Sequence, residues 1–255
     1  MGILVEVVDV DEACADLTDL AVVFPAYNEE SNVARAMETA LDVGVGLVVC
    51  VDDCSTDRTG EIMEGFRGRA RVELVHHQTN QGKQAAVKHG LQAAVQRRGV
   101  EKFATLDADM QDDPAELKRV AAPVGAYDLA VAYRLRNEMP AIRRMANSLA
   151  NIPYRCLCGL RMHDVQAAFR IYSRPVARYL AEHLAVEGGY TLEHTSMPLF
   201  GEIARQEKRH VRIAEVRTPC PYGEAESHIG FTDNVRLTLA AVQCAWQLAR
   251  RLRGT

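Results

Sequence analysis

Four short apolar runs, each followed by a polar segment, dominate the first half of the sequence. The runs, at residues 20–25, 46–53, 72–77 and 102–109, are predicted strands, and helices are predicted between them. Their apolar residues form largely continuous stretches rather than alternating with polar ones, which is typical of strands buried on both faces of a sheet. This alternation predicts an α/β fold with a mostly parallel sheet flanked by helices.

Capping residues and later segments complete the expected element order. Asn28 is expected to cap the first helix and Gly44 to end it, and Ser55 or Thr56 is expected to cap the second. Further along, the pattern predicts helices at residues 114–124, 137–159, 175–185 and 231–255, and strands at residues 127–134 and 164–174. Residues 210–223 are predicted to be a strand that leads out to a loop containing glycine. The length favours one large domain.

Polar residues gather where the first four predicted strands end. In open parallel sheets, ligands bind outside the carboxyl ends of the strands, so these clusters predict one shared crevice. The four clusters are Tyr27-Asn28-Glu29, Asp52-Asp53, Asn80-Gln81-Gly82-Lys83, and residues 107–111.

The sequence "LDADMQDDP" at residues 106–114 concentrates carboxylates at the end of the fourth predicted strand. Asp107 and Asp109 are two residues apart, so they face one side if strand geometry persists, where hard oxygen ligands suit Mg²⁺ or Mn²⁺. A catalytic pair and a solvated turn before Pro114 are the alternatives. Asp112 and Asp113 fit the turn.

Two other strand-end residues have a functional and an ordinary interpretation. The carboxylate of Asp53 suits hydrogen bonds from a nucleotide base or ribose, although its neighbours also suit a helix cap. Lys83 follows Gly82 at a helix start, where an anion is favoured, although a solvated lysine fits equally well.

Composition excludes several classes of protein. A net charge of −4 and 6% aromatic residues argue against a nucleic-acid partner. Seven cysteines, an odd number in a chain of 255 residues, indicate free thiols in a reducing cytoplasm rather than a disulfide framework or a zinc site. His76, His77 and His194 lack partners at ligand spacing. No signal peptide or membrane-spanning run is expected, so the predicted location is cytoplasmic.

The ordered motifs resemble one enzyme family. "FPAYNEESNV", "VVCVDDCSTDRT", "NQGKQAAVKHG" and "LDADMQDDP" are similar, in this order, to the family 2 glycosyltransferases of GT-A (Rossmann-like) fold. "YDLAVAYR", "DVQAAFRIYS", "GGY" and "YGEAESHIG" extend the similarity toward the branch with dolichol-phosphate mannose synthases and other polyprenyl-phosphate glycosyltransferases. The resemblance covers about residues 20–235. It implies an N-terminal extension at residues 1–18, a GT-A domain at residues 19–230 and a C-terminal amphipathic helix at residues 231–255.

The resemblance also implies roles for individual residues. The base and ribose would be held by Pro25, Tyr27, Glu29 and Asp53, with Val51 beside them. The metal and donor diphosphate would be coordinated by Asp107, Asp109 and Gln111. The phosphates would be met by Arg134 and, on the acceptor, by Arg143 and Arg144, while Asp164, Gln166 and Arg170 would line the acceptor side.

Departures from the family pattern affect the diphosphate clamp and the acceptor side. His228, expected to contact the diphosphate, stands where lysine is common, Cys220 replaces an expected arginine, and residues 224–225 look inserted. Thr195 occupies a position where relatives carry glutamate, and Glu193 is displaced from it by what we expect to be one strand period.

The implied activity is that of a hexosyltransferase that requires Mg²⁺ or Mn²⁺. It would move a hexose with inversion from GDP-mannose or UDP-glucose to a polyprenyl phosphate. The alternatives are a soluble acceptor, for which Asp112, Asp113 or Glu193 is a candidate base, and a nucleotide-sugar-binding module without turnover.

The tail carries apolar residues at helical spacing and ends in an arginine cluster. The pattern fits a helix packed on the domain, and it also fits a helix lying at the inner face of a membrane. Peripheral membrane contact is therefore a second expectation for this helix.

Overall fold

The structure is a computed structural model that describes residues 2–10, 15–134, 141–186, 192–219 and 231–253. Its strands are β1 (Ile3–Val8), β2 (Leu20–Ala26), β3 (Leu47–Asp52), β4 (Val72–His76), β5 (Lys102–Thr105), β6 (Leu129–Tyr133), β7 (Arg170–Ser173) and β8 (Val211–Arg217). Its helices are α1 (Val33–Asp42), α2 (Thr59–Glu64), α3 (Lys83–Val95), the 3₁₀ turn η1 (Pro114–Glu116), α4 (Leu117–Ala121), α5 (Ala141–Cys158), α6 (Arg174–His183), α7 (Leu192–Gln206) and α8 (Phe231–Arg253).

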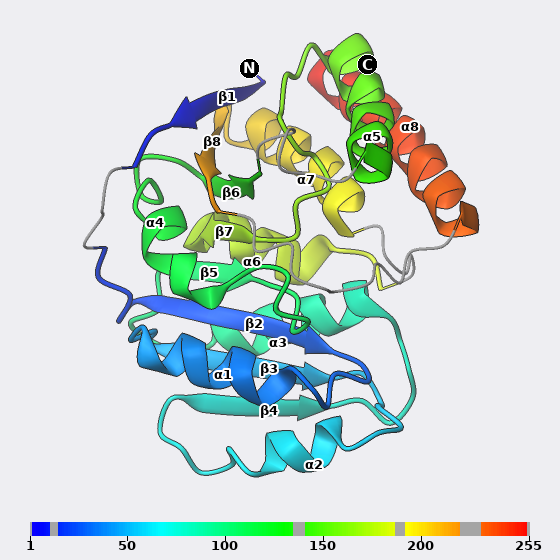
Figure 1. Ribbon diagram of the computed structural model, residues 1–255. Coiled ribbons are helices and arrows are strands. Elements are labelled where there is room, and N and C mark those ends of the chain that lie inside the picture. The colour runs from blue at the N-terminus through cyan, green and yellow to red at the C-terminus, as the bar shows by residue number, and fades with distance from the viewer. Residues whose placement is uncertain (1, 11–14, 135–140, 187–191, 220–230, 254–255) are drawn as a thin grey trace.

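The eight described strands form one mixed sheet in the order β1-β8-β6-β7-β5-β2-β3-β4 (Figure 1). Neighbouring strands are parallel except around β7, which runs antiparallel to both β5 and β6. The carboxyl ends of β2, β3, β4 and β5 therefore lie on the same side of the sheet, where these parallel strands end. The predicted α/β fold with a mostly parallel sheet is confirmed.

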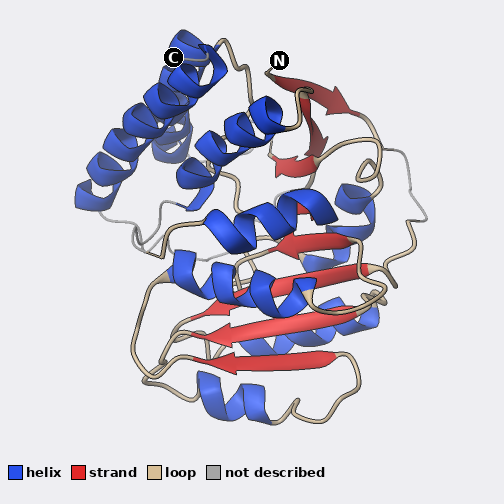
Figure 2. Ribbon diagram, turned by 180° about the vertical axis from the view of Figure 1, so that it is seen from behind, coloured by secondary structure: helices blue, strands red, loops and turns tan. Residues whose placement is uncertain are grey.

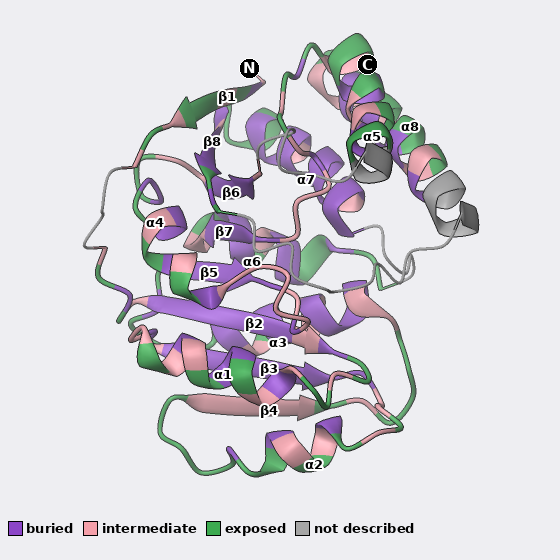
Figure 3. Ribbon diagram, in the orientation of Figure 1, coloured by how far each residue is buried: buried purple, intermediate pink, exposed green. Residues whose placement is uncertain are grey.

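Helices cover both faces of the sheet (Figures 1 and 2). One apolar core lies between the sheet and helices α1, α2 and α4, and the other lies against α3, α6 and α7. The strands β2 and β3 are buried almost throughout (Figure 3), as their continuous apolar sequences predict. Helices α5 and α8 pack against each other, and α8 also packs on α7.

Close packing of α3 against the sheet depends on a glycine. A Cβ added at Gly90 would lie 2.3 Å from Cγ1 of Val23 and 3.1 Å from Cγ2 of Val51. The backbone of α3 therefore rests directly on β2 and β3, and this contact sets the position of the helix start at Lys83.

The fourth predicted strand ends earlier than expected. β5 stops at Thr105 rather than Asp109, and the chain turns at Met110, which has φ +60°. The alternation nevertheless persists beyond the strand, because Leu106 and Ala108 are buried while Asp107 and Asp109 are partly exposed. Asp107 and Asp109 lie close enough together that the charge of Asp107 raises the pKa of Asp109, and a shared ligand side for the two stays a prediction.

Two elements were not predicted. β1 pairs in parallel with β8 at one edge of the sheet, although this segment was expected to be an N-terminal extension. α7 occupies a segment that was expected to have the period of a strand. The boundaries at residues 18 and 230 stay a prediction.

Candidate active site at the carboxyl ends of the strands

The loops after β2 and β3 bind each other. The side-chain oxygen of Asn28 accepts a hydrogen bond from the backbone N–H of Thr56 (2.8 Å), and the hydroxyl of Ser55 accepts one from the N–H of Asn28 (3.1 Å). The N–H of Glu29 donates to the buried hydroxyl of Thr59 (2.7 Å). The predicted helix caps are therefore wrong for Asn28, Ser55 and Thr56, because these polar groups satisfy the facing loop instead.

Asp53 holds the turn that precedes α3. One carboxylate oxygen accepts from the N–H of Gln81 (2.8 Å) and the other from the N–H of Gly82 (2.7 Å), where φ is +87°. Nδ1 of the buried His77 lies 2.7 Å from the same carboxylate, and its Nε2 lies 2.8 Å from Nδ1 of His89. Both carboxylate oxygens of Asp53 thus accept hydrogen bonds from within the protein. This contact of His77 could not be predicted from the sequence, because Asp53 is 24 residues away.

Lys83 joins two elements that are distant in sequence. Its ammonium nitrogen lies 2.8 Å from Oδ1 of Asp107 and 3.1 Å from Oε1 of Glu193 on α7. Burial disfavours the charged lysine, but the two carboxylates outweigh burial and raise its pKa above the ordinary value. The ammonium is therefore held by acids of the protein, whereas the sequence left an anion site and a solvated lysine equally open.

Asp109 lies in the most acidic part of the site. Its Oδ1 accepts a hydrogen bond from the N–H of Gln111 (2.9 Å), and it makes no ion pair among the described residues. Burial, reinforced by the nearby carboxylate of Asp107 and by those of Glu29 and Asp112, raises the pKa of Asp109 to about 6. A local excess of negative charge favours a cation beside Asp109.

Arg134, just after β6, fixes the loop that carries this acid. Its guanidinium group donates to the backbone oxygen of Gln111 (2.7 Å) and pairs with Asp112. Asp113 caps the following turn by accepting from the N–H of Ala115 (2.9 Å), as predicted, but Asp112 does not take part in that cap.

Arg170 is a buried clamp. Its guanidinium group donates to the backbone oxygen of Val165 (2.7 Å) and to the hydroxyl of Ser196 at the start of α7 (2.9 Å). It is almost fully buried, so it orders this region rather than lining an open acceptor surface. Nearby, burial raises the pKa of Asp164 to about 6.

The remaining predicted site residues fall into three groups. Tyr27 and Arg144 are exposed, Pro25 and Gln166 are half-buried, and Val51 is buried in the core beneath α3. Arg144 joins none of the described contacts of the carboxylate cluster. Cys220, residues 224–225, His228 and the side chain of Arg143 lie outside the described residues.

The chemistry of the acids fits a divalent cation that is shared with a ligand. Within the described ranges, no three His, Cys, Asp or Glu side chains form a complete metal site. Mg²⁺ is commonly held by one or two carboxylates and completed by water and substrate phosphates. Asp109, with Asp107 and Gln111 beside it, provides such a partial set of oxygen ligands.

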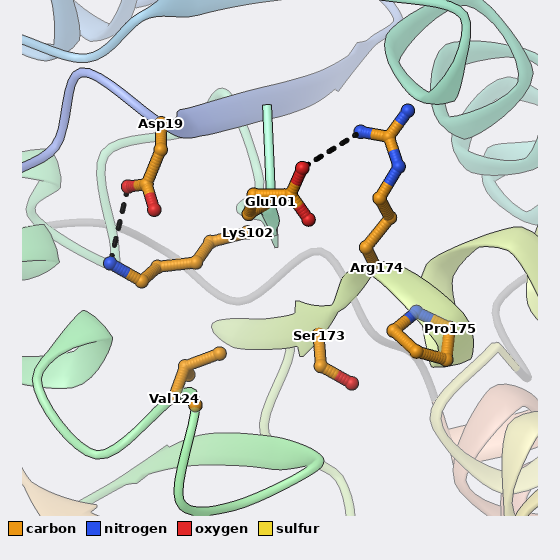
Figure 4. A pocket seen from close by; sticks show the side chains of 8 residues that line it. Asp19, Glu101, Lys102, Val124, Ser173, Arg174 and Pro175 are labelled. Atoms are coloured by element: carbon orange, nitrogen blue, oxygen red, sulfur yellow. Dashed lines mark hydrogen bonds and ion pairs between the residues drawn. The ribbon is translucent and has the colours of Figure 1, made fainter. Parts of the chain in front are cut away.

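A hollow of about 270 Å³ lies at the other end of the strands, beside the start of β2 and β5 (Figure 4). Asp19, just before β2, and Lys102, at the start of β5, face each other there at 3.1 Å. The hollow contains none of the predicted site residues, so it is separate from the strand-end cluster. Its lining residues are Asp19, Glu101, Lys102, Val124, Gly125, Ser173, Arg174 and Pro175.

A GT-A-like α/β sheet with acidic loops at its strand ends is the class that this fold and site define. Residues 21–180 match the family model described as Glycosyl transferase family 2. The match spans more than half of the chain, so the protein belongs to the family 2 glycosyltransferases.

Two curated transferases are similar to part of this chain. The chain is 33% identical over 165 residues to the undecaprenyl-phosphate 4-deoxy-4-formamido-L-arabinose transferase of Pseudomonas aeruginosa. The aligned segment covers 62% of this chain and 48% of that protein. The chain is 28% identical over 169 residues to the transferase of the same name from Pectobacterium carotovorum, with 63% and 50% covered. The chain thus spans about half the length of these relatives.

Solved structures share the fold at low identity. Glucosyl-3-phosphoglycerate synthase from Mycobacterium tuberculosis, solved with Mn²⁺, UDP and phosphoglyceric acid, superposes with a TM-score of 0.63 at 15% identity, over 89% of this chain and 78% of that chain. Mannosyl-3-phosphoglycerate synthase from Rubrobacter xylanophilus gives 0.62 at 18% identity, over 92% and 74%. These similarities support the GT-A-like fold.

Proposed function

We propose that this protein is an inverting glycosyltransferase that requires a divalent cation and moves a hexose from a nucleotide sugar to a polyprenyl phosphate. The observation that carries the proposal is the acidic cluster of Asp107 and Asp109 at the strand ends. It is supported by family membership and by relatives named as undecaprenyl-phosphate transferases. GDP-mannose and UDP-glucose remain the proposed donors.

The donor would lie across the strand ends, with its nucleotide toward the linked loops after β2 and β3. Exposed Tyr27 offers a ring face to the base, and Glu29 lies near enough to Asp109 to affect its pKa. Asp53 would act by shaping the turn at Gln81 and Gly82, because both its oxygens already serve the protein.

Asp109, with Asp107 and Gln111, would hold Mg²⁺ or Mn²⁺ beside the donor diphosphate. The bound cation would supply a charge that offsets the negative charge growing on the leaving nucleoside diphosphate. The carboxylate of Asp109 must be ionised for this role. Arg134 keeps the loop in place through Gln111 and Asp112.

A phosphate acceptor simplifies the proton chemistry. Its oxygen is already anionic, so it can attack the anomeric carbon from the side opposite the leaving group without a general base. This removes the need to assign that role to Asp112 or Asp113. Glu193 is unsuited to it in this geometry, because its carboxylate is paired with Lys83.

The test is transfer of radiolabelled sugar to an organic-extractable product. Full-length protein would be incubated with Mn²⁺, undecaprenyl phosphate in detergent, and GDP-mannose or UDP-glucose in turn. The proposal predicts labelled lipid with one donor and at least about a 100-fold loss for Asp109→Asn. Glu101→Gln is the matched control, because Glu101 lies just before β5, at the end of the strand away from the acidic cluster. Transfer only to a water-soluble acceptor, or nucleotide binding without any transfer, would contradict the proposal.

A further inference from the structure

Exposed apolar side chains are concentrated on α5 and α8. Ten large apolar residues are exposed among the described residues, and six of them lie on these two helices. The six are Met145, Leu149 and Ile152 on α5 and Leu239, Val242 and Trp246 on α8. We name these six residues, with the exposed arginines of the same helices, the outer helical face.

α8 carries apolar residues on two sides, one that packs on the domain and one that is exposed. Its inner side is buried on α7, where a Cβ added at Gly201 would lie 2.6 Å from Cδ1 of Leu248. Its outer side carries Leu239, Val242 and Trp246 at intervals of three and four residues, the spacing of one helix face. Leu239 is 64% exposed and Trp246 is 53% exposed. Packing on the domain therefore uses one side of α8 and leaves another apolar side uncovered by the described residues.

α5 repeats this arrangement beside α8. Tyr154 and Ala150 are buried on its inner side, whereas Met145, Leu149 and Ile152 are exposed at intervals of four and three residues. The two helices contact each other, and both lie away from the β2-β3-β4 part of the sheet (Figures 1 and 2). The exposed apolar residues thus belong to one end of the molecule.

The charge of these two helices is opposite to that of the chain. Together α5 and α8 contain seven arginines and one aspartate, a net charge of +6, whereas the whole chain carries −4. The remaining residues therefore carry −10. The guanidinium group of Arg250 lies 4.8 Å from the ring centre of Trp246, so a cation sits directly beside the exposed aromatic residue.

We propose that the outer helical face binds the surface of an anionic lipid bilayer. Helices that lie in a membrane interface combine an exposed apolar side, arginines and a tryptophan, as this face does. The attraction of clustered arginines to anionic headgroups supplies the charge complementarity. A second copy of the chain is a poorer partner, because a twofold interface would place two faces of the same positive charge together. None of the described helices is long and apolar enough to cross a membrane.

The location of the face suits a lipid-linked acceptor, a point that rests on the proposed function. α5 begins at Ala141, seven residues after Arg134, so the extended chain allows at most about 25 Å between them. A protein bound through α5 and α8 would keep its strand ends close to the bilayer surface. The membrane contact itself does not depend on transfer.

The test is binding of the full chain to vesicles in EDTA, without donor or acceptor. Phosphatidylcholine vesicles with and without phosphatidylglycerol would be sedimented at low and high salt. The proposal predicts at least about tenfold tighter binding to the anionic vesicles, weakened by salt. Trp246 is the single tryptophan of the chain, so its emission should shift to shorter wavelength only with anionic vesicles.

Matched substitutions separate the face from general effects. The double variant Leu239→Glu/Trp246→Glu should lose at least about tenfold in vesicle affinity and keep its melting temperature. Val7→Glu on β1 replaces a similarly exposed apolar residue elsewhere and should bind as the unmodified chain does. Equal binding to neutral vesicles, no effect of the double variant, or a dimer in sedimentation velocity that this variant dissociates would overturn the proposal. Failed sugar transfer with intact vesicle binding would reject the proposed function alone.

Discussion

Replacing Lys83 by methionine removes the ammonium group that joins the loop after β5 to α7. In the structure this nitrogen lies 2.8 Å from Asp107 and 3.1 Å from Glu193. The side chain of Glu193 is only 8% exposed, so it would keep a buried charge without its cation. Asp107, at 34%, can regain water.

The exposed fractions of Glu193 and Asp107 determine how much unfolding free energy Lys83→Met should lose. Removing one partner of a fully buried ion pair costs about 3–5 kcal/mol. Because one of the two carboxylates here can rehydrate, we expect Lys83→Met to lower the free energy of unfolding by about 2–3 kcal/mol. Adding Glu193→Gln to Lys83→Met neutralises the stranded carboxylate and should restore about 1 kcal/mol or more.

Urea denaturation at pH 7.5 would measure these changes as a double-mutant cycle. Lys102→Met is the matched control, because Lys102 is similarly exposed but pairs with the single carboxylate of Asp19. That variant should lose about 1 kcal/mol or less. A loss below about 1 kcal/mol for Lys83→Met, or strictly additive effects with Glu193→Gln, would refute the cross-link. Unchanged stability with weakened nucleotide binding would favour the anion site instead.

Other predictions concern packing, pH and the linked loops. Gly90→Ala should lower the free energy of unfolding by about 1–3 kcal/mol in urea denaturation, because its Cβ would clash with Val23; wild-type stability would contradict this contact. Burial, followed by the nearby positive charge of an arginine, lowers the pKa of His194 from 6.5 to about 4, so only the unfolded chain gains its proton between these pH values. Stability should therefore fall by about 2 kcal/mol from pH 8 to pH 5 through this group, and His194→Gln should remove that part of the decline. A pH dependence identical in both proteins would exclude it. Asn28→Ala should cost about 1–2 kcal/mol in thermal or urea unfolding, since it removes the bond to Thr56 and places alanine at φ +57°; no loss would show that the loops are held otherwise.

The first strands, and the grouping of Asp53, Asp107 and Asp109 at the ends of those strands, could be predicted because their sequence signals are local. Each apolar run stands beside its own polar end, so β2, β3 and β4 could be predicted within a residue or two. Parallel strand direction then brings Asp53, Asp107 and Asp109 to one edge without any further information.

The missed elements have two different explanations. β1 has the apolar, β-branched sequence ILVEVV, which is a local strand signal, but this segment was assigned to an N-terminal extension because its partner strand β8 lies about 200 residues later. α7 is buried on nearly all sides and contains Pro198, so it lacks the polar stripe that reveals most helices.

The detailed contacts of the site are also nonlocal. Lys83 and Glu193 are 110 residues apart, and Asn28 and Thr56 are 28 residues apart. Residue type alone indicated that these groups were polar and near strand ends. Residue type could not show that these groups would form hydrogen bonds and ion pairs with each other rather than with a ligand or a helix terminus.

The central claim is that the carboxylates after β5 bind a divalent cation together with a nucleotide diphosphate. Isothermal titration calorimetry with UDP and GDP, each in Mn²⁺ and in EDTA, tests it most directly. At least one nucleotide should bind about tenfold or more tightly in Mn²⁺, and Asp109→Asn should abolish that difference while leaving the melting temperature of the unliganded protein within a few degrees. Equal nucleotide affinity in Mn²⁺ and EDTA, or an unchanged Mn²⁺ effect in Asp109→Asn, would contradict the claim.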